Sequence, residues 1–222
     1  MVHEGTVIDA PRYAQALREL GVSSADVHAL RIKLADVAGT RRGVLHVAGG
    51  KPSLALRPLA QAPQEITVNA LPIRDERKAP ERVGPDSGWQ QTTLAALSTN
   101  EGLLADESGR VVSAVMHPLL AITPGRVAVS THPHTPETVT VASVADMLRG
   151  WGIPVVEEPH GFNLNRLTQS EVWVIDPVYG ARLVETWVEY GTPRPATVLF
   201  ERGGVPSHRE VNDARREQAT TL

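Results

Sequence analysis

The sequence lacks cysteine altogether, and it is poor in lysine, in aromatic side chains and in long apolar runs. Without cysteine the chain can form neither disulfides nor thiolate zinc sites. No uninterrupted apolar segment approaches the roughly 20 residues that a membrane-spanning helix needs. The first residues show no basic segment followed by an apolar run, so we expect no signal peptide and a cytoplasmic protein.

The charges are nearly balanced. The 222 residues include 22 Lys and Arg against 25 Asp and Glu, which gives a formal net charge of −3. This balance provides no electrostatic reason to expect nucleic acid or an anionic membrane as a partner. Gly-rich dinucleotide loops, phosphate-binding P-loops, Gly-x-Ser-x-Gly elbows and His-Glu-x-x-His helices are also missing, so the enzyme classes that they mark receive no support.

Hydrophobic periodicity predicts two helices within residues 10–38, followed by a hairpin of strands 44–48 and 53–57. Residues 58–63 are rich in Pro, Ala and Gln and indicate a linker, so we predict domains at 1–62 and 63–222. The second part is expected to hold strands 66–71, 102–105, 111–115, 119–123, 127–130, 155–156, 171–175 and 181–188, helices 88–97 and 139–151, and a helical turn at 163–167. From Gly203 onward the polar chain predicts a loose helix or a frayed tail.

Three segments of the second part carry a family resemblance: Glu101 to Val112, Gly152 to Glu158, and Glu171 to Val174. Their order and spacing resemble the C-terminal domain of class IV aminotransferases and aminodeoxychorismate lyases, the fold-type IV pyridoxal-phosphate enzymes. The resemblance implies an α+β fold, with a small N-terminal α/β domain and a β-rich C-terminal pseudo-barrel flanked by helices. It also implies a homodimer and an N-terminal domain longer than the one present, so we expect that domain to be truncated.

The chain departs from the family where the cofactor should be held. We align Val83 with the Schiff-base lysine, and valine has no amine. Ser113 stands where a carboxylate would hold the pyridine nitrogen. Of the phosphate-binding turn at a helix N-terminus, Thr140 is kept but the glycine is lost. The second phosphate loop would begin at Asp176-Pro177, and a carboxylate next to a proline is a poor place for a dianion. We therefore expect no cofactor.

An alternative alignment shifts the register by five residues and makes Lys78 the Schiff-base lysine. In that case the chain would bind pyridoxal phosphate and keep the chemistry of the family.

Several polar groups would face the interdomain cleft of such a fold. These are Arg82, Ser113, His117, Thr140, Asp176, Tyr179 and Arg182. If residues 81–83 form a strand, alternation places Glu81 on the inward face of Val83 and turns Arg82 away. Glu81 is then a candidate general base, or else an exposed loop residue.

Each titratable candidate has a structural alternative. His132 and His134 could transfer protons or flank a metal, but no third ligand has suitable spacing, and both could be solvated loop histidines. His117 could equally be a satisfied buried histidine. Asp176 could act as a base or cap a turn, and Arg182 could bind a substrate carboxylate or lie on the surface. Tyr179 is a further catalytic candidate in the same loop as Asp176.

We therefore weigh three functions. The first is a cofactor-independent lyase, isomerase or cyclase acting on a small, possibly anionic metabolite in bacterial specialised metabolism. The second is a non-catalytic homologue that binds a ligand or partner. The third is a pyridoxal-phosphate lyase or transaminase that uses Lys78. A cleft lined by Glu81, Asp176 and Arg182 would favour the first, and an apolar exposed patch would favour the second.

Overall fold

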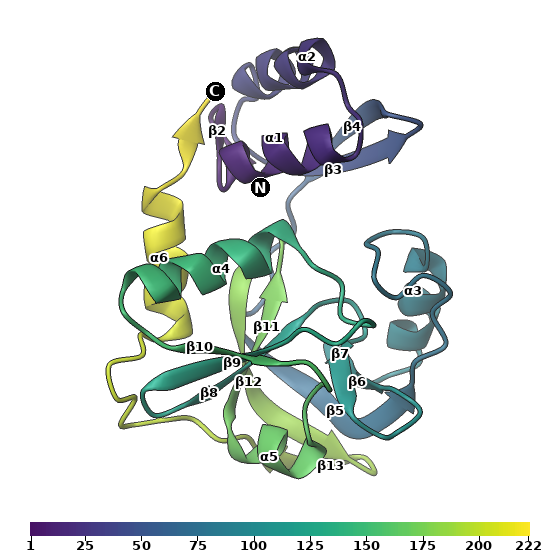
Figure 1. Cartoon of the computed structure of the whole chain (residues 1–222), viewed down its shortest axis with the longest axis vertical. Coiled ribbons are helices and arrows are strands. Elements are labelled where there is room, and N and C mark those ends of the chain that lie inside the picture. Colours follow the sequence, from purple (N-terminus) through teal and green to yellow (C-terminus); the bar gives the residue numbers. More distant parts are fainter.

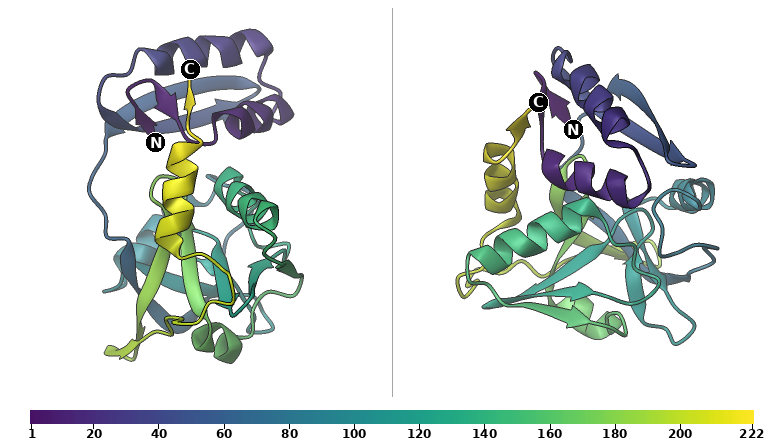
Figure 2. Two further views of the ribbon diagram at one scale, coloured as in Figure 1. Left: turned by 90° about the vertical axis from the view of Figure 1, so that its left-hand side faces the viewer. Right: turned by 45° about the horizontal axis from the view of Figure 1, so that its top comes forward.

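Two units of unequal size make up the computed structural model, which describes residues 1–222. Figure 1 shows a small unit at the top, built around helices α1 and α2, above a larger body formed mainly of strands. Helices α4 and α6 of the body lie on the side that faces the small unit, and Figure 2 shows α6 rising from the body toward the small unit. The N- and C-termini of the chain both lie at the small unit.

The small unit combines two helices with a five-stranded sheet. Its elements are β1 (Val2–His3), β2 (Thr6–Val7), α1 (Ala10–Glu19), α2 (Ser24–Ala35), β3 (Thr40–Ala48) and β4 (Lys51–Pro58). The Ser23 side chain caps α2 by accepting a hydrogen bond from the Asp26 backbone. The two helices pack on the sheet through a small apolar cluster that includes Leu17, Val27 and Leu30. The two predicted helices and the predicted hairpin are thus present.

The body is a nine-stranded, strongly curled sheet with helices around it. Its elements are β5 (Glu65–Arg74), α3 (Ser87–Ala95), β6 (Glu101–Ala105), β7 (Val111–Ala114), β8 (Leu119–Thr123), β9 (Arg126–Ser130), α4 (Val139–Gly150), β10 (Val155–Glu158), α5 (Leu164–Gln169), β11 (Glu171–Asp176), β12 (Gly180–Glu189), β13 (Thr192–Pro195) and α6 (His208–Glu217). The strand order is β10-β9-β8-β11-β12-β5-β6-β7, with β13 paired to β12.

Apolar residues on both faces of this sheet form its core. One cluster of 14 buried residues fills one face, and a second of 13 lies between the sheet and α4 and α6. Trp173 on β11 is fully buried in the second cluster. Burial on both faces explains why β6, β8 and β11 are runs of apolar residues rather than alternating patterns.

The C-terminal segment differs from the loose or frayed tail that its polarity predicts. Ser207 and Glu210 form a capping box at the start of α6, and Val211, Asn212 and Arg215 of this helix are buried. The Asn212 side chain accepts a hydrogen bond from the Ala181 backbone of β12. Strand β14 (Thr220–Thr221) then pairs with β2 and joins the sheet of the small unit. Polar side chains with buried partners hold the tail in place, and composition alone does not reveal them.

Removing the capping box should therefore loosen the tail. We expect Ser207→Ala to lower the free energy of unfolding by about 1 kcal/mol, because the first turn of α6 loses its side-chain acceptor. Urea denaturation followed by tryptophan fluorescence measures this loss. Ser98→Ala, which removes an exposed hydroxyl that makes no hydrogen bond, serves as the control, and an equal effect of both changes would contradict the capping role.

No helix of the structure is both long and apolar enough to span a lipid bilayer.

Candidate functional site

Ion pairs and hydrogen bonds fix the small unit against the body. The Asp9 carboxylate, just before α1, accepts a hydrogen bond from Ser143 Oγ of α4 at 2.5 Å and one from the Arg215 guanidinium of α6 at 2.6 Å. Arg12 lies 2.8 Å from Asp146 of α4. The Asp9 carboxylate thus links the start of α1 to α4 and α6. These contacts give a site between the two units a defined geometry.

Thr140 lies at this junction, in the first turn of α4. It is 1% exposed, and its hydroxyl has no hydrogen-bond partner. The phenol of Tyr13 from α1 lies beside it, and burial raises the pKa of Tyr13. The position that aligns with the phosphate-binding turn of the family therefore lies beside a tyrosine of the small unit and is buried.

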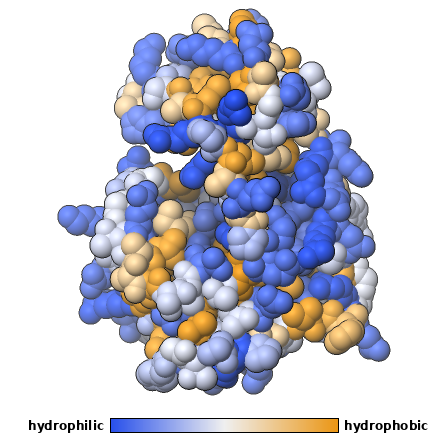
Figure 3. Space-filling model, turned by 180° about the vertical axis from the view of Figure 1, so that it is seen from behind, coloured by the Kyte–Doolittle hydropathy of each residue, from blue (hydrophilic) through white to orange (hydrophobic).

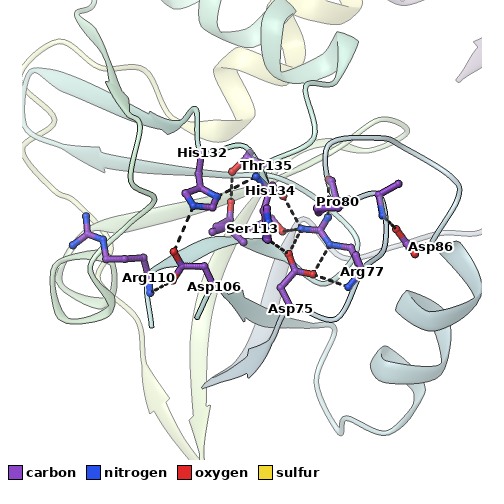
Figure 4. A network of polar contacts seen from close by, with 12 residues as sticks. Asp75, Arg77, Pro80, Asp86, Asp106, Arg110, Ser113, His132, His134 and Thr135 are labelled. Carbon is purple, nitrogen blue, oxygen red and sulfur yellow. Dashed lines mark hydrogen bonds and ion pairs between the residues drawn. The ribbon is translucent and has the colours of Figure 1, made fainter. Parts of the chain in front are cut away.

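Asp75 and Arg77 form a buried ion pair directly after β5 (Figure 4). Two nitrogens of the Arg77 guanidinium donate to the two Asp75 oxygens at 2.8 and 2.9 Å. Arg77 also donates to the His134 carbonyl at 2.7 Å and to Ser113 Oγ at 3.4 Å. Burial acts to raise the pKa of Asp75, but its hydrogen bonds from Arg77 outweigh this and hold the pKa below the ordinary 3.8. The Ser113 hydroxyl thus accepts a hydrogen bond from Arg77, whose guanidinium has a structural role.

The segment that follows is a loop rather than a strand, so the expected alternation of residues 81–83 is wrong. Pro80 and Pro85 cannot donate to a sheet, and the Asp86 carboxylate accepts the backbone N–H groups of Lys78 and Ala79. Lys78 is exposed on this loop. The neighbouring candidates Glu81 and Arg82 are exposed as well, and Val83 is 72% exposed. Glu81 therefore matches the alternative of an exposed loop residue.

His132 and His134 belong to a tightly held loop after β9. Nδ1 of His132 accepts the backbone N–H of His134 at 3.0 Å, which assigns the proton to Nε2, 3.4 Å from Asp106. Burial lowers the pKa of His132, and the neighbouring His134 lowers it further. The charge of Asp106 acts to raise this pKa but is outweighed. His134 Nδ1 lies 3.2 Å from Asp75. Both rings therefore face structural carboxylates, and no group of three or more ligands suited to a metal exists in the chain.

His117 is the one predicted histidine that joins other predicted residues. Its Nδ1 lies 2.6 Å from Glu101 and its Nε2 lies 3.6 Å from Asp176. Burial acts to lower the pKa of His117, but the hydrogen bond and charge of Glu101 and the charge of Asp176 outweigh it and raise the pKa above 6.5. Arg182 follows, 3.8 Å from Asp176. The result is a buried row of alternating charges.

Asp176 caps the loop that follows β11. Its Oδ1 accepts the backbone N–H groups of Val178 and Tyr179 at 2.7 and 3.1 Å, which is the geometry of the turn-cap alternative. The Tyr179 hydroxyl donates to the Ala60 carbonyl of the linker, and the Arg182 side chain donates to the Pro63 carbonyl. Arg182 is buried in a central strand, because β12 lies between β11 and β5. These groups anchor the linker.

A cavity of about 550 Å³ opens between the small unit and this loop. It is lined by 23 residues, of which 16 are hydrophobic; the body contributes Val83, Pro177 and Val178. The lining contains no aspartate, glutamate or lysine and three arginines, Arg18, Arg31 and Arg42. None of the site residues predicted from the sequence lines this cavity. Viewed from behind, apolar surface covers part of the small unit and recurs where it meets the body (Figure 3).

The three arginines are the site residues that the sequence did not reveal. Arg31 lies beside Leu30 and Leu34 on the apolar stripe of α2, and this flanking position is the only signal of it in the sequence. Arg18 of α1 and Arg42 of β3 stand in polar segments, and both come to line the cavity only when the small unit folds.

Comparison with known proteins identifies the fold. Neither a protein-family model nor a curated protein matches the sequence. Among solved structures, 4-amino-4-deoxychorismate lyase from Pseudomonas aeruginosa is similar with a TM-score of 0.67 at 18% identity, covering 98% of this chain and 88% of that one. Branched-chain amino acid aminotransferase from Escherichia coli gives 0.64 at 13% identity, over 97% and 82%. Another branched-chain amino acid aminotransferase, from T.th., solved with pyridoxamine 5'-phosphate, gives 0.54 at 18% identity, over 74% and 55%.

The chain therefore has the fold of class IV aminotransferases, as its motifs predicted. The predicted α+β class, with a curled β-rich body flanked by helices, is confirmed. The division into domains at residue 62 stays a prediction, and β14 returns to the small unit.

The residues present do not fit pyridoxal phosphate in the manner of that fold. Covalent attachment requires a lysine amine within the site. Lys33, Lys51 and Lys78 are all exposed, and none lines the junction cavity. At the position that aligns with the family's phosphate-binding turn, the Thr140 hydroxyl is buried beside Tyr13.

Proposed function

We propose that this chain uses the class IV aminotransferase fold to bind a small molecule in the junction cavity, without pyridoxal phosphate. The observation that carries the proposal is the cavity itself: its volume lies within the roughly 300–1,000 Å³ typical of small-molecule sites, and its lining is mainly apolar. The candidate residues outside the cavity support it, because Ser113, His132 and His134 hold structural partners. Glu81 and Arg82 point to solvent.

A neutral fluorescent probe tests binding. N-phenyl-1-naphthylamine should bind with saturation at one site per chain, because its rings bury in the apolar cavity. Ala14→Phe fills the cavity from α1 and should abolish this binding, whereas Gln15→Phe, exposed on the same helix, should retain it. Equal binding by both variants would place the probe elsewhere and overturn the proposal.

The independence from pyridoxal phosphate has its own test. We expect the purified protein mixed with pyridoxal phosphate to show no absorbance band beyond that of the free cofactor and of slow surface labelling. After borohydride reduction, peptide mass spectrometry should find Lys78 labelled no more than Lys51, whose side chain is 81% exposed. Stoichiometric labelling confined to Lys78 would restore the pyridoxal-phosphate alternative.

One observation favours a cofactor-independent enzyme as the second candidate. Nε2 of His117 lies 3.6 Å from Asp176, the pKa of His117 is raised, and the two residues that follow Asp176, Pro177 and Val178, line the cavity. A lyase, isomerase or cyclase could use the proton of His117 near a bound metabolite. Incubating a ligand recovered from the protein with fresh wild-type protein and with His117→Gln tests this: conversion by the wild type alone would support it. The homodimer, the cytoplasmic location and the role in specialised metabolism stay predictions.

A further inference from the structure

The junction cavity has a charge that the rest of the molecule does not share. The whole chain has a formal net charge of −3, whereas the side chains that line the cavity include three arginines and no carboxylate. The two chain termini, the ammonium of Met1 and the carboxylate of Leu222, also lie in the lining and contribute one charge of each sign. Arginine remains charged at all physiological pH values. The apolar cavity therefore carries a local positive potential within a weakly acidic protein.

These arginines also have no partner in the chain. Arg18 of α1, Arg31 of α2 and Arg42 of β3 take part in none of its side-chain hydrogen bonds or ion pairs. Other arginines at the junction are paired, as Arg12 is with Asp146 and Arg215 with Asp9. Three guanidinium groups from three elements thus surround one cavity with their donors available.

Apolar surface beside these arginines is left open to water. Val44 and Leu45 of β3 are 37% and 38% exposed, and Val83 on the body side is 72% exposed. Exposed apolar residues that gather around a cavity mark a binding surface, since covering them removes apolar area from water. The exposed binding surface is therefore apolar within the cavity and cationic around it.

We propose that the ligand of this cavity is an amphipathic anion: a carboxylate, or a similar acid, attached to an apolar chain or ring. Its apolar part occupies the cavity among Leu17, Leu30 and Leu54, and its acid group is held by the guanidinium groups. This assignment rests on the proposed function and specifies its ligand. It requires no lysine and no cofactor.

Competition between probes of one length separates the two proposals. Decanoate, decanol and decyltrimethylammonium share an apolar chain and differ in the charge of the head. We expect decanoate to displace N-phenyl-1-naphthylamine at least tenfold more strongly than decanol, and the cation to be the weakest. If the neutral probe fails to bind, the proposed function is wrong; if it binds and decanol equals decanoate, only the ligand class is wrong.

Two triple variants with the same loss of charge locate the acid group. Arg18→Gln/Arg31→Gln/Arg42→Gln removes the cavity arginines, and Arg57→Gln/Arg82→Gln/Arg166→Gln removes three exposed arginines outside it. Arg57 pairs across the hairpin with Arg42, so it is a close control. The first variant should lose the preference for decanoate while still binding the neutral probe, and the second should keep both. An equal loss in both variants would show a non-specific charge effect and overturn the assignment.

A second copy of the chain could cover the same surface. Probe binding per chain would then fall as the protein concentration rises and the copies associate. Unchanged stoichiometry over a hundredfold range of concentration is the result expected for a free cavity.

Discussion

Asp75→Asn is expected to lower the free energy of unfolding by about 3 kcal/mol, because it leaves a buried guanidinium without its counter-ion. The side chains of Asp75 and Arg77 are 0% and 2% exposed. Arginine cannot release its proton, so Arg77 would retain a full charge with only neutral acceptors: the His134 and Pro80 carbonyls, the Ser113 hydroxyl and the amide oxygen of the new asparagine. Urea unfolding at pH 7, followed by tryptophan fluorescence, measures the change.

A surface ion pair of similar length provides the control. Arg74 and Glu107 lie 2.9 Å apart, with side chains 70% and 86% exposed, so Glu107→Gln should change stability by no more than about 0.5 kcal/mol. Because the folded-state pKa of Asp75 is depressed, its contribution is present above about pH 4 and is lost as the pH falls through the folded value. If Asp75→Asn were as mild as Glu107→Gln, the pair would not be buried in solution as the structure has it.

Local sequence signals predicted most of the fold. The Asp106 to Gly109 turn joins β6 to β7 as expected, with Asp106 accepting the backbone N–H groups of Ser108 and Arg110. Periodicity located α1, α2 and α4, because each of these helices buries an apolar stripe against a core and such a stripe is visible in the sequence. The C-terminal tail escaped prediction because Asn212 and Arg215 are polar residues whose partners, Ala181 and Asp9, lie far away in the sequence.

The candidate site was harder to predict, and for a physical reason. The orientation expected for Glu81 holds only if residues 81–83 form a strand, whereas Pro80, Gly84 and Pro85 favour the loop that is present. His117, Asp176 and Arg182 were singled out by residue type and do come together, but Glu101, which binds His117 most closely, was not. The cavity arginines could not be found from sequence, because exposed arginines on separate elements carry no local pattern.

The charge row around His117 makes a prediction that depends on pH. Glu101, Asp176 and Arg182 all face this ring, and the two carboxylates raise its folded-state pKa above the ordinary 6.5. A raised pKa means that the folded state binds the proton more tightly than the unfolded chain. The stabilisation is therefore complete below about pH 6.5 and is lost as the pH rises through the folded-state pKa. In that window stability falls by up to about 1.4 kcal/mol per pH unit.

His117→Gln should remove this dependence, because glutamine keeps a hydrogen-bond donor near Glu101 but carries no charge. We expect the variant to be less stable than the wild type by about 2 kcal/mol at pH 6. The deficit should be smaller at pH 8.5, because above pH 6.5 the unfolded chain has lost its proton and proton binding stabilises the folded state less as the pH rises. The difference between the two proteins is the quantity to measure, since His208, whose pKa is lowered by burial, contributes the opposite slope to both. His160→Gln, an exposed ring outside the row, is the matched control. A deficit that stays constant from pH 6 to 8.5 would mean that His117 acts through packing alone, and the buried row of charges would then lose its role as a proton-binding element.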